Sequence, residues 1–151
     1  MILFCDTSAL IKLYIVEEHS ELLKAHATGA DAVAVCRIAW AEAHAALCRR
    51  AREVQEDSPL IEQAKTALAR DWPNYVVLEV NQPLVELAGE YADTFALRGY
   101  DSIQLAAAAE AGRISHSPIT FACFDTRLNK AARVLGLQIL SGEKQAKKIK
   151  S

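Results

Sequence analysis

The sequence lacks several features that mark other classes of protein. Its four cysteines include no Cys-x-x-Cys pair, and no histidine stands at zinc-finger spacing from them. We therefore expect buried free thiols, which fit a reducing, cytoplasmic compartment; the residues are Cys5, Cys36, Cys48 and Cys123. No apolar run approaches the roughly 20 residues that a membrane-spanning helix needs. The opening MILFCD has no basic segment before its apolar residues, so we expect no signal peptide.

A large charge of one sign and abundant aromatic residues are also missing. The formal net charge is -2 over 151 residues, so the chain is not a polycation that coats nucleic acid. Any positive surface for RNA has to be local. Aromatic residues make up only 7%, whereas hydrophobic residues reach 52% and alanine runs are common. This composition excludes a disordered chain and predicts a single helix-rich domain with a closely packed core.

What the sequence has is an alternation of short apolar runs and longer helical patterns. We expect strands at 2–4, 32–35, 75–80, 120–124 and 137–140, and helices at 9–16, 20–28, 38–53, 59–72, 83–97, 102–111 and 127–135. Gly99 and Gly112 are expected to end two of these helices. The strands are almost unbroken apolar segments, which predicts an α/β protein with a parallel sheet between helices. Residues 1–141 are assigned to this domain, and 142–151 to a basic C-terminal tail with four lysines.

Two aspartates, Asp6 and Asp125, each follow a predicted strand directly and precede a threonine and a helix. The carboxyl ends of parallel strands meet at one edge of a sheet, where ligands bind in open α/β folds, so we expect the two to share a site. The alternative is that each aspartate only caps the next helix, which stabilises it by about 1 kcal/mol. Asp101, which opens the helical segment SIQLAAAAEA, has the same two interpretations.

Glu42 stands in the middle of a predicted helix, with only alanines and Ile38 at the positions three and four residues away. Burying an unpaired carboxylate is costly, so either the helix exposes Glu42 or a positive group meets it. Clustered carboxylates repel one another unless a cation lies among them, and hard oxygen ligands suit Mg²⁺ or Mn²⁺. If the four acids converge, a bound divalent ion would lower the pKa of a water molecule and make it a nucleophile. If the substrate is an RNA phosphodiester, attack by this water, and not by a ribose 2′-hydroxyl, would leave a 5′-phosphate.

Four segments in order resemble the PIN-domain ribonucleases and, among them, the VapC-type toxins of toxin–antitoxin pairs. They are MILFCDTSALIKLY, VCRIAWAEAHAAL, ALRGYDSIQLAAA and TFACFDTRLNKAARVLGLQIL. The resemblance implies a three-layer α/β/α sandwich with a parallel sheet of about five strands. It also implies a metal-dependent endoribonuclease that acts as the toxin of a type II pair. Such toxins usually form homodimers and are neutralised by a small antitoxin that reaches into the active site.

Carried over residue by residue, the resemblance gives the catalytic, Mg²⁺- or Mn²⁺-binding acids as Asp6, Glu42, Asp101 and Asp125. In this comparison Asp6 and Asp101 are the more direct ligands. Ser8 supplies the hydroxyl that supports the site beside Asp6; the alternative is that Ser8 only caps the following helix. Three positions depart from the family pattern. Gln104 stands where histidine is common, Ser102 where alanine is common, and Cys123 where serine or threonine is frequent. The last departure puts a supporting hydroxyl in question, not the metal site.

An acidic pocket repels phosphate, so an RNA-cleaving site needs basic residues at its rim. The candidates for RNA binding are Arg98, Arg127, Arg37 and Lys12. Arg49, Arg50 and Arg52 form a further basic cluster at the end of a predicted helix, where cations also complement the helix dipole.

Two other functions are weighed against the nuclease. One is a catalytically silent PIN-like module that only binds protein or RNA, which the complete set of acids disfavours. The other is a phosphotransfer domain; the aspartyl-phosphatase type needs a second aspartate two residues after the first, where this chain has Ser8.

Overall fold

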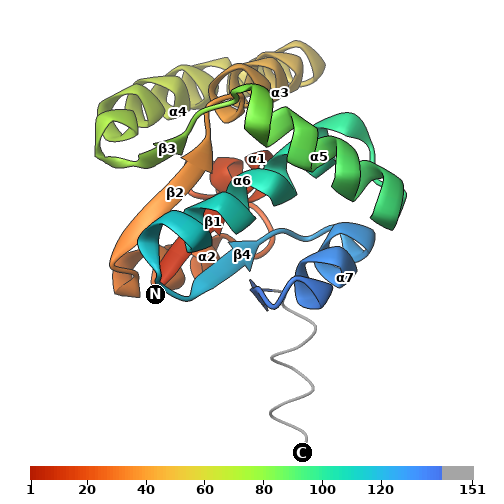
Figure 1. The fold of residues 1–151 in the computed structure, drawn as a ribbon. Helices are drawn as coiled ribbons and strands as arrows, with labels where there is room; N and C mark the ends of the chain where they lie inside the picture. Colours follow the sequence, from red (N-terminus) through yellow and green to blue (C-terminus); the bar gives the residue numbers. More distant parts are fainter. Residues whose placement is uncertain (141–151) are drawn as a thin grey trace, which may run out of the picture.

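Five short strands form one parallel sheet in the order β3-β2-β1-β4-β5 (Figure 1). They are β1 (Ile2–Cys5), β2 (Ala32–Cys36), β3 (Val76–Leu78), β4 (Ile119–Ala122) and β5 (Gln138–Leu140). The computed structural model describes residues 1–140, and the tail predicted at 142–151 lies outside the described residues. The predicted α/β class with a five-stranded parallel sheet is confirmed.

Seven helices within the described residues pack on the two faces of the sheet. They are α1 (Thr7–Lys12), α2 (Ser20–Gly29), α3 (Ala39–Glu53), α4 (Ser58–Asp71), α5 (Gln82–Phe95), α6 (Gly99–Ser115) and α7 (Thr126–Val134), with 3-10 turns at Gln55–Asp57 and Trp72–Asn74. Figure 1 shows α5 and α6 in front of the sheet and α1 and α2 behind it. No helix in residues 1–140 is long and apolar enough to cross a membrane.

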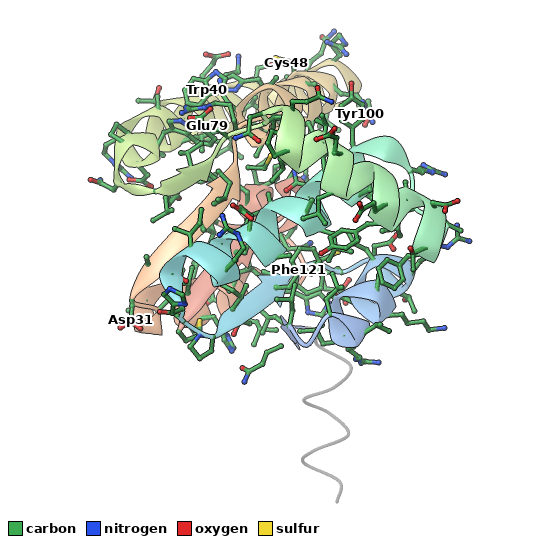
Figure 2. All side chains as sticks on the ribbon, viewed as in Figure 1. Asp31, Trp40, Cys48, Glu79, Tyr100 and Phe121 are labelled. Carbon is green, nitrogen blue, oxygen red and sulfur yellow. The ribbon has the colours of Figure 1, made fainter. Side chains whose placement is uncertain are left out.

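The central strand β1 contributes to the cores on both faces. Leu3 and Cys5 pack with residues of α1, α2 and α3, whereas Phe4 packs with residues of α5, α6 and α7. Successive side chains of a strand point to opposite faces, so a strand covered on both faces has to be apolar throughout. Phe4 stacks on its register partner Phe121 of β4 with ring centroids 5.9 Å apart, and Figure 2 shows Phe121 in the middle of the molecule. The three-layer sandwich is therefore as expected.

Both helix ends that we expected at glycines lie elsewhere. α5 ends where Ala96 takes the left-handed conformation (φ 54°), and Gly99 begins α6 instead of ending α5. Gly112 lies inside α6. A Cβ atom at position 112 would stand 3.1 Å from Cγ1 of Ile119, so this glycine gives α6 its close approach to β4. Because α6 begins earlier than expected, Asp101 lies in its first turn and not in front of it.

The first helix is also shorter than expected, since α1 ends at Lys12 and residues 13–19 turn back toward α2. Ser20 closes this turn: its hydroxyl accepts from the backbone nitrogen of Glu17 at 3.0 Å and donates to the carbonyl of Ile15 at 2.9 Å. The cysteine prediction holds with one exception. All four thiols are free and three are buried, but Cys48 is partly exposed.

Candidate active site

The four predicted acids reach the carboxyl edge of the sheet from different elements. Asp6 directly follows β1, and Asp125 follows the neighbouring strand β4 after a two-residue link. Glu42 lies in the first turn of α3, which follows β2, and Asp101 lies in the first turn of α6. The sheet order places β1 between β2 and β4, so these segments meet at one place.

The electrostatics couple the charge of Asp101 to those of the three other acids. Burial raises the pKa of Asp101, and the charges of Asp125 and Glu42 raise it further, while Arg98 opposes the shift. Burial is also the main reason that the pKa of Asp6 is raised, to which the charge of Asp101 adds. None of the four carboxylates forms a salt bridge with another residue of the described chain. The site therefore concentrates negative charge without a lysine or arginine paired to it.

The two aspartates at the strand ends also cap helices. Asp6 Oδ1 accepts from the backbone nitrogen of Ala9 at 2.9 Å, and Asp125 Oδ1 accepts from that of Leu128 at 2.8 Å. The alternative that these aspartates cap helices is therefore correct. The cap engages only one oxygen of each carboxylate. No nitrogen or hydroxyl donor within residues 1–140 reaches the second oxygen of either aspartate. The Cys123 thiol is a further hydrogen-bond partner of Asp6. Capping and a role in a metal site are therefore compatible.

Ser8 does not cap the helix, because Asp6 holds the cap position of α1. Its hydroxyl donates to Asp6 Oδ1 at 2.8 Å. The helix-cap alternative for Ser8 is thus wrong, and the contact matches the supporting position that the resemblance implied.

Glu42 is held by two neutral side chains that sequence reasoning did not assign to the site. Its Oε1 accepts from the Thr7 hydroxyl at 2.8 Å and from Nε2 of Gln104 at 3.0 Å, and Nε2 also lies 3.2 Å from the Thr7 oxygen. Gln104 is buried, and its Oε1 has no partner in the described part of the chain. The signals in the sequence were slight: Thr7 adjoins Asp6, and Gln104 lies one helical turn after Asp101.

The four basic residues predicted to bind RNA have different surroundings. Arg37 forms a two-point ion pair with Glu79, in which Nε donates to Oε2 at 3.2 Å. Lys12 forms an ion pair with Glu17 at 3.1 Å. Arg98 immediately precedes α6 and Arg127 lies in the first turn of α7; both are exposed, and neither forms a salt bridge within residues 1–140. Of these four candidates, only Arg98 and Arg127 therefore have no ion-pair partner within residues 1–140.

The donor set suits a hard cation, since it consists of carboxylate oxygens and supporting hydroxyl and amide groups. No three His, Cys, Asp or Glu side chains in residues 1–140 stand in an arrangement that would hold a metal ion. The described residues therefore do not form a closed metal cage. Magnesium is commonly bound in this way, through one or two carboxylates with water and substrate completing its coordination. The oxygen donors present are therefore of the kind that such an ion takes.

A family model for the PIN domain matches residues 3–134. The chain belongs to the PIN domain family. This PIN domain is 31% identical over 142 residues to ribonuclease VapC45 of Mycobacterium tuberculosis, and the match covers 91% of this chain and 94% of VapC45. The four motifs found in the sequence therefore indicated the correct family.

Two solved structures share the fold of this PIN domain. VapBC2 from Rickettsia felis, bound to a DNA fragment from its promoter, has a TM-score of 0.63 and 13% identity, and the match covers 93% of this chain and 98% of that one. VapC20 of Mycobacterium tuberculosis, a sarcin–ricin loop cleaving toxin, has a TM-score of 0.60 and 20% identity, with coverages of 85% and 94%. At these identities the likeness supports the fold alone.

Proposed function

We propose that this PIN domain is a Mg²⁺- or Mn²⁺-dependent endoribonuclease that hydrolyses RNA phosphodiester bonds as the toxin of a type II toxin–antitoxin pair. The observation that carries the proposal is the charge coupling of Asp101 to the three other acids, none of which forms a salt bridge within residues 1–140. The names of its relatives support the same activity, since VapC45 is called a ribonuclease and VapC20 a toxin.

The side chains have distinct tasks in this proposal. Asp6 and Asp101 would hold the ion, which supplies a water nucleophile near neutral pH and compensates charge on the phosphate. Ser8 fixes the orientation of Asp6, while Thr7 and Gln104 fix that of Glu42. Asp125 is exposed and adds to the negative charge near Asp101. Hydrolysis by water predicts products with 5′-phosphate ends.

The test is cleavage of RNA by the purified protein with Mg²⁺ or Mn²⁺, with EDTA and with the Asp6→Asn variant. Asparagine keeps the Oδ1 acceptor, so the cap on Ala9 is retained and only the charge is lost. We expect cleavage by the wild type with metal and none by the variant. Equal cleavage by both would refute the assignment. The alternative of a catalytically silent binding module predicts no heat on titration with Mn²⁺.

The partners in this proposal are the RNA substrate, an antitoxin peptide and a second copy of the chain. The neighbouring VapBC2 structure supports a partner protein. Light scattering on the purified chain, with and without the product of an adjacent short reading frame, tests both assemblies. A monomer that binds no such product would contradict them.

Arg98 and Arg127 are expected to hold the RNA backbone, because both are exposed and unpaired near the acids. Changing both to glutamine should weaken binding of a short single-stranded RNA in EDTA and lower the slope of log affinity against log salt by roughly 0.7 per lost contact. Anisotropy measurements over a salt series give both quantities. Arg133→Gln, on an exposed position of α7, is the control. Identical slopes in both variants would contradict the assignment.

Gln104 is a positioning residue in this proposal, since it touches Glu42 and not the substrate. Gln104→Met keeps the volume but removes the donor, and we expect a 10- to 100-fold loss in kcat with little change in KM, as is typical for groups that orient metal-site residues. Gln104→His restores a donor and should recover part of the loss. A loss that is equal in both variants would indicate a packing role instead.

A further inference from the structure

A second group of charged residues surrounds a pocket of about 180 Å³ between α1 and α3. Ser8, which donates to Asp6, lines this pocket. Lys12 follows Ser8 by four residues on α1, and Ala46 follows Glu42 by four residues on α3. One turn of helix advances about 5.4 Å. The pocket therefore continues the candidate active site along both helices.

Two cations hold one carboxylate in this pocket. Lys12 Nζ lies 3.1 Å from Oε1 of Glu17, and Nη1 of Arg50 donates to Oε2 at 2.8 Å, so each oxygen has its own cation. The side chains of Lys12, Glu17 and Arg50 are 14%, 24% and 39% exposed. Burial favours a higher pKa for Glu17, but the hydrogen bonds from Arg50 and Lys12 outweigh it and lower the pKa. Glu17 is thus an anion in a site built from two cations.

An aromatic ring connects this pocket with the acids. Lys12 Nζ lies 5.1 Å from the centre of the Phe124 ring, and Phe124 immediately precedes Asp125. The His19 ring stacks on Phe124 with centroids 4.7 Å apart and an angle of 2° between the planes. His19 has the left-handed conformation (φ 70°) at the end of the turn that carries Glu17. The turn is therefore fastened at two points, by the ion pairs of Glu17 and by the stacking of His19 on Phe124.

We propose that Lys12 and Arg50 form a subsite for a phosphate of the bound RNA strand away from the cleaved position, and that Glu17 occupies this subsite as an internal anion. The inference rests on the proposed function, because it assumes an RNA strand at the acids. A carboxylate and a phosphate present similar anionic oxygens to lysine and arginine, so one replaces the other without a change in the two cations. Incoming RNA displaces Glu17, which lies on a turn outside the helices.

The structural alternative is that the ion pairs only fasten the turn to α3. The two accounts differ in the effect of removing the Glu17 charge. If Glu17 competes with RNA, its neutral form gives tighter binding, because two cations become available to phosphate. If Glu17 is only a fastening, its neutral form leaves RNA affinity unchanged or weakens it.

The experiment measures binding of a fluorescein-labelled single-stranded RNA by anisotropy, in EDTA and in an Asp101→Asn background, so that no cleavage occurs. We expect Glu17→Gln to bind about 3- to 10-fold more tightly and to show a steeper salt dependence. Glu110→Gln is the matched control, since it makes the same change of charge and breaks the pair in which Arg113 Nε donates to Glu110 at 2.8 Å. It should bind as its parent does. Unchanged or weaker binding by Glu17→Gln would overturn the proposal.

Arg50→Gln gives a second test that leaves residue 17 in place. It should weaken RNA binding, and the double variant Glu17→Gln/Arg50→Gln should lose the gain of the single Glu17→Gln variant. Absence of either effect would also overturn the subsite. The proposed function fails separately, since it predicts metal-dependent cleavage by the wild type. Tighter binding by Glu17→Gln without any cleavage would leave an RNA-binding protein that has this subsite.

Discussion

Replacing Asp101 with asparagine is expected to reduce RNA cleavage by about 10³-fold or more, as is typical when a single catalytic group is removed. An amide carries no charge and is a poorer ligand for a divalent ion. The Asp101 side chain makes no hydrogen bond within residues 1–140, unlike Asp6 and Asp125, which cap helices. The substitution therefore removes charge without removing a structural contact.

Initial rates with Mg²⁺ and with Mn²⁺ on the same RNA measure this effect, with circular dichroism as the check on folding. Asp93→Asn, at an exposed position of α5, is the matched control and should cleave as the wild type does. Retention of more than about a tenth of the wild-type rate in Asp101→Asn would contradict the central role of this acid.

The divalent ion is expected to stabilise the protein as well as to activate it. At a concentration about 100 times its Kd, an ion that binds only the folded state adds about 2.7 kcal/mol to the free energy of unfolding. For a chain of this size that corresponds to a rise in Tm of roughly 5 to 10 °C. Thermal unfolding with Mn²⁺ and with EDTA measures the shift. Asp6→Asn should show little of it, and a full shift in that variant would place the ion elsewhere.

The pH dependence of the metal-free protein follows from the same acids. The pKa values of Asp6 and Asp101 are raised in the folded state, by burial and by neighbouring carboxylates, so the folded form holds these protons to higher pH than the unfolded chain does. Asp6 and Asp101 therefore contribute to the free energy of unfolding at pH values below the ordinary aspartate pKa. This contribution is lost as the pH rises through their raised pKa values. Metal-free Asp6→Asn should therefore gain Tm over the wild type as pH rises toward 7.

The measured quantity is the difference in Tm between Asp6→Asn and the wild type at each pH. This difference is needed because other acids change stability with pH in the opposite direction. Arg113 lowers the pKa of Glu110 and Arg37 lowers that of Glu79, so these pairs lose stability as pH falls. Both proteins share these pairs, and the subtraction removes them. A difference in Tm that does not change with pH would contradict the raised pKa of Asp6.

Local patterns in the sequence were sufficient to predict a parallel sheet and the strand ends at which Asp6 and Asp125 stand. Strands covered on both faces have to be apolar, and Asp6 and Asp125 stand where such strands end. The helix end at Gly112 was wrong because the role of this glycine is tertiary: it allows a contact with Ile119 of β4, which no pattern within α6 reveals.

The supporting contacts of the site were missed for a related reason. Glu42 is held by Thr7 and Gln104, which lie 35 and 62 residues away in the chain. The partner of Arg37 is Glu79, at a separation of 42 residues. These pairs form only once the strand order is β3-β2-β1-β4-β5, and that order was not predicted from the sequence. The residue types thus indicated the candidate acids, but not the side chains that hydrogen-bond to them.

The helix caps at Asp6 and Asp125 affect which mutations such a protein tolerates during evolution. Asparagine caps a helix as well as aspartate does, so in the proposed nuclease one substitution at either position would remove the activity and keep the helix cap. In the toxin–antitoxin pair proposed above, the inactive protein would keep the surface that the antitoxin binds. It would then bind antitoxin without cleaving RNA and leave active copies uninhibited.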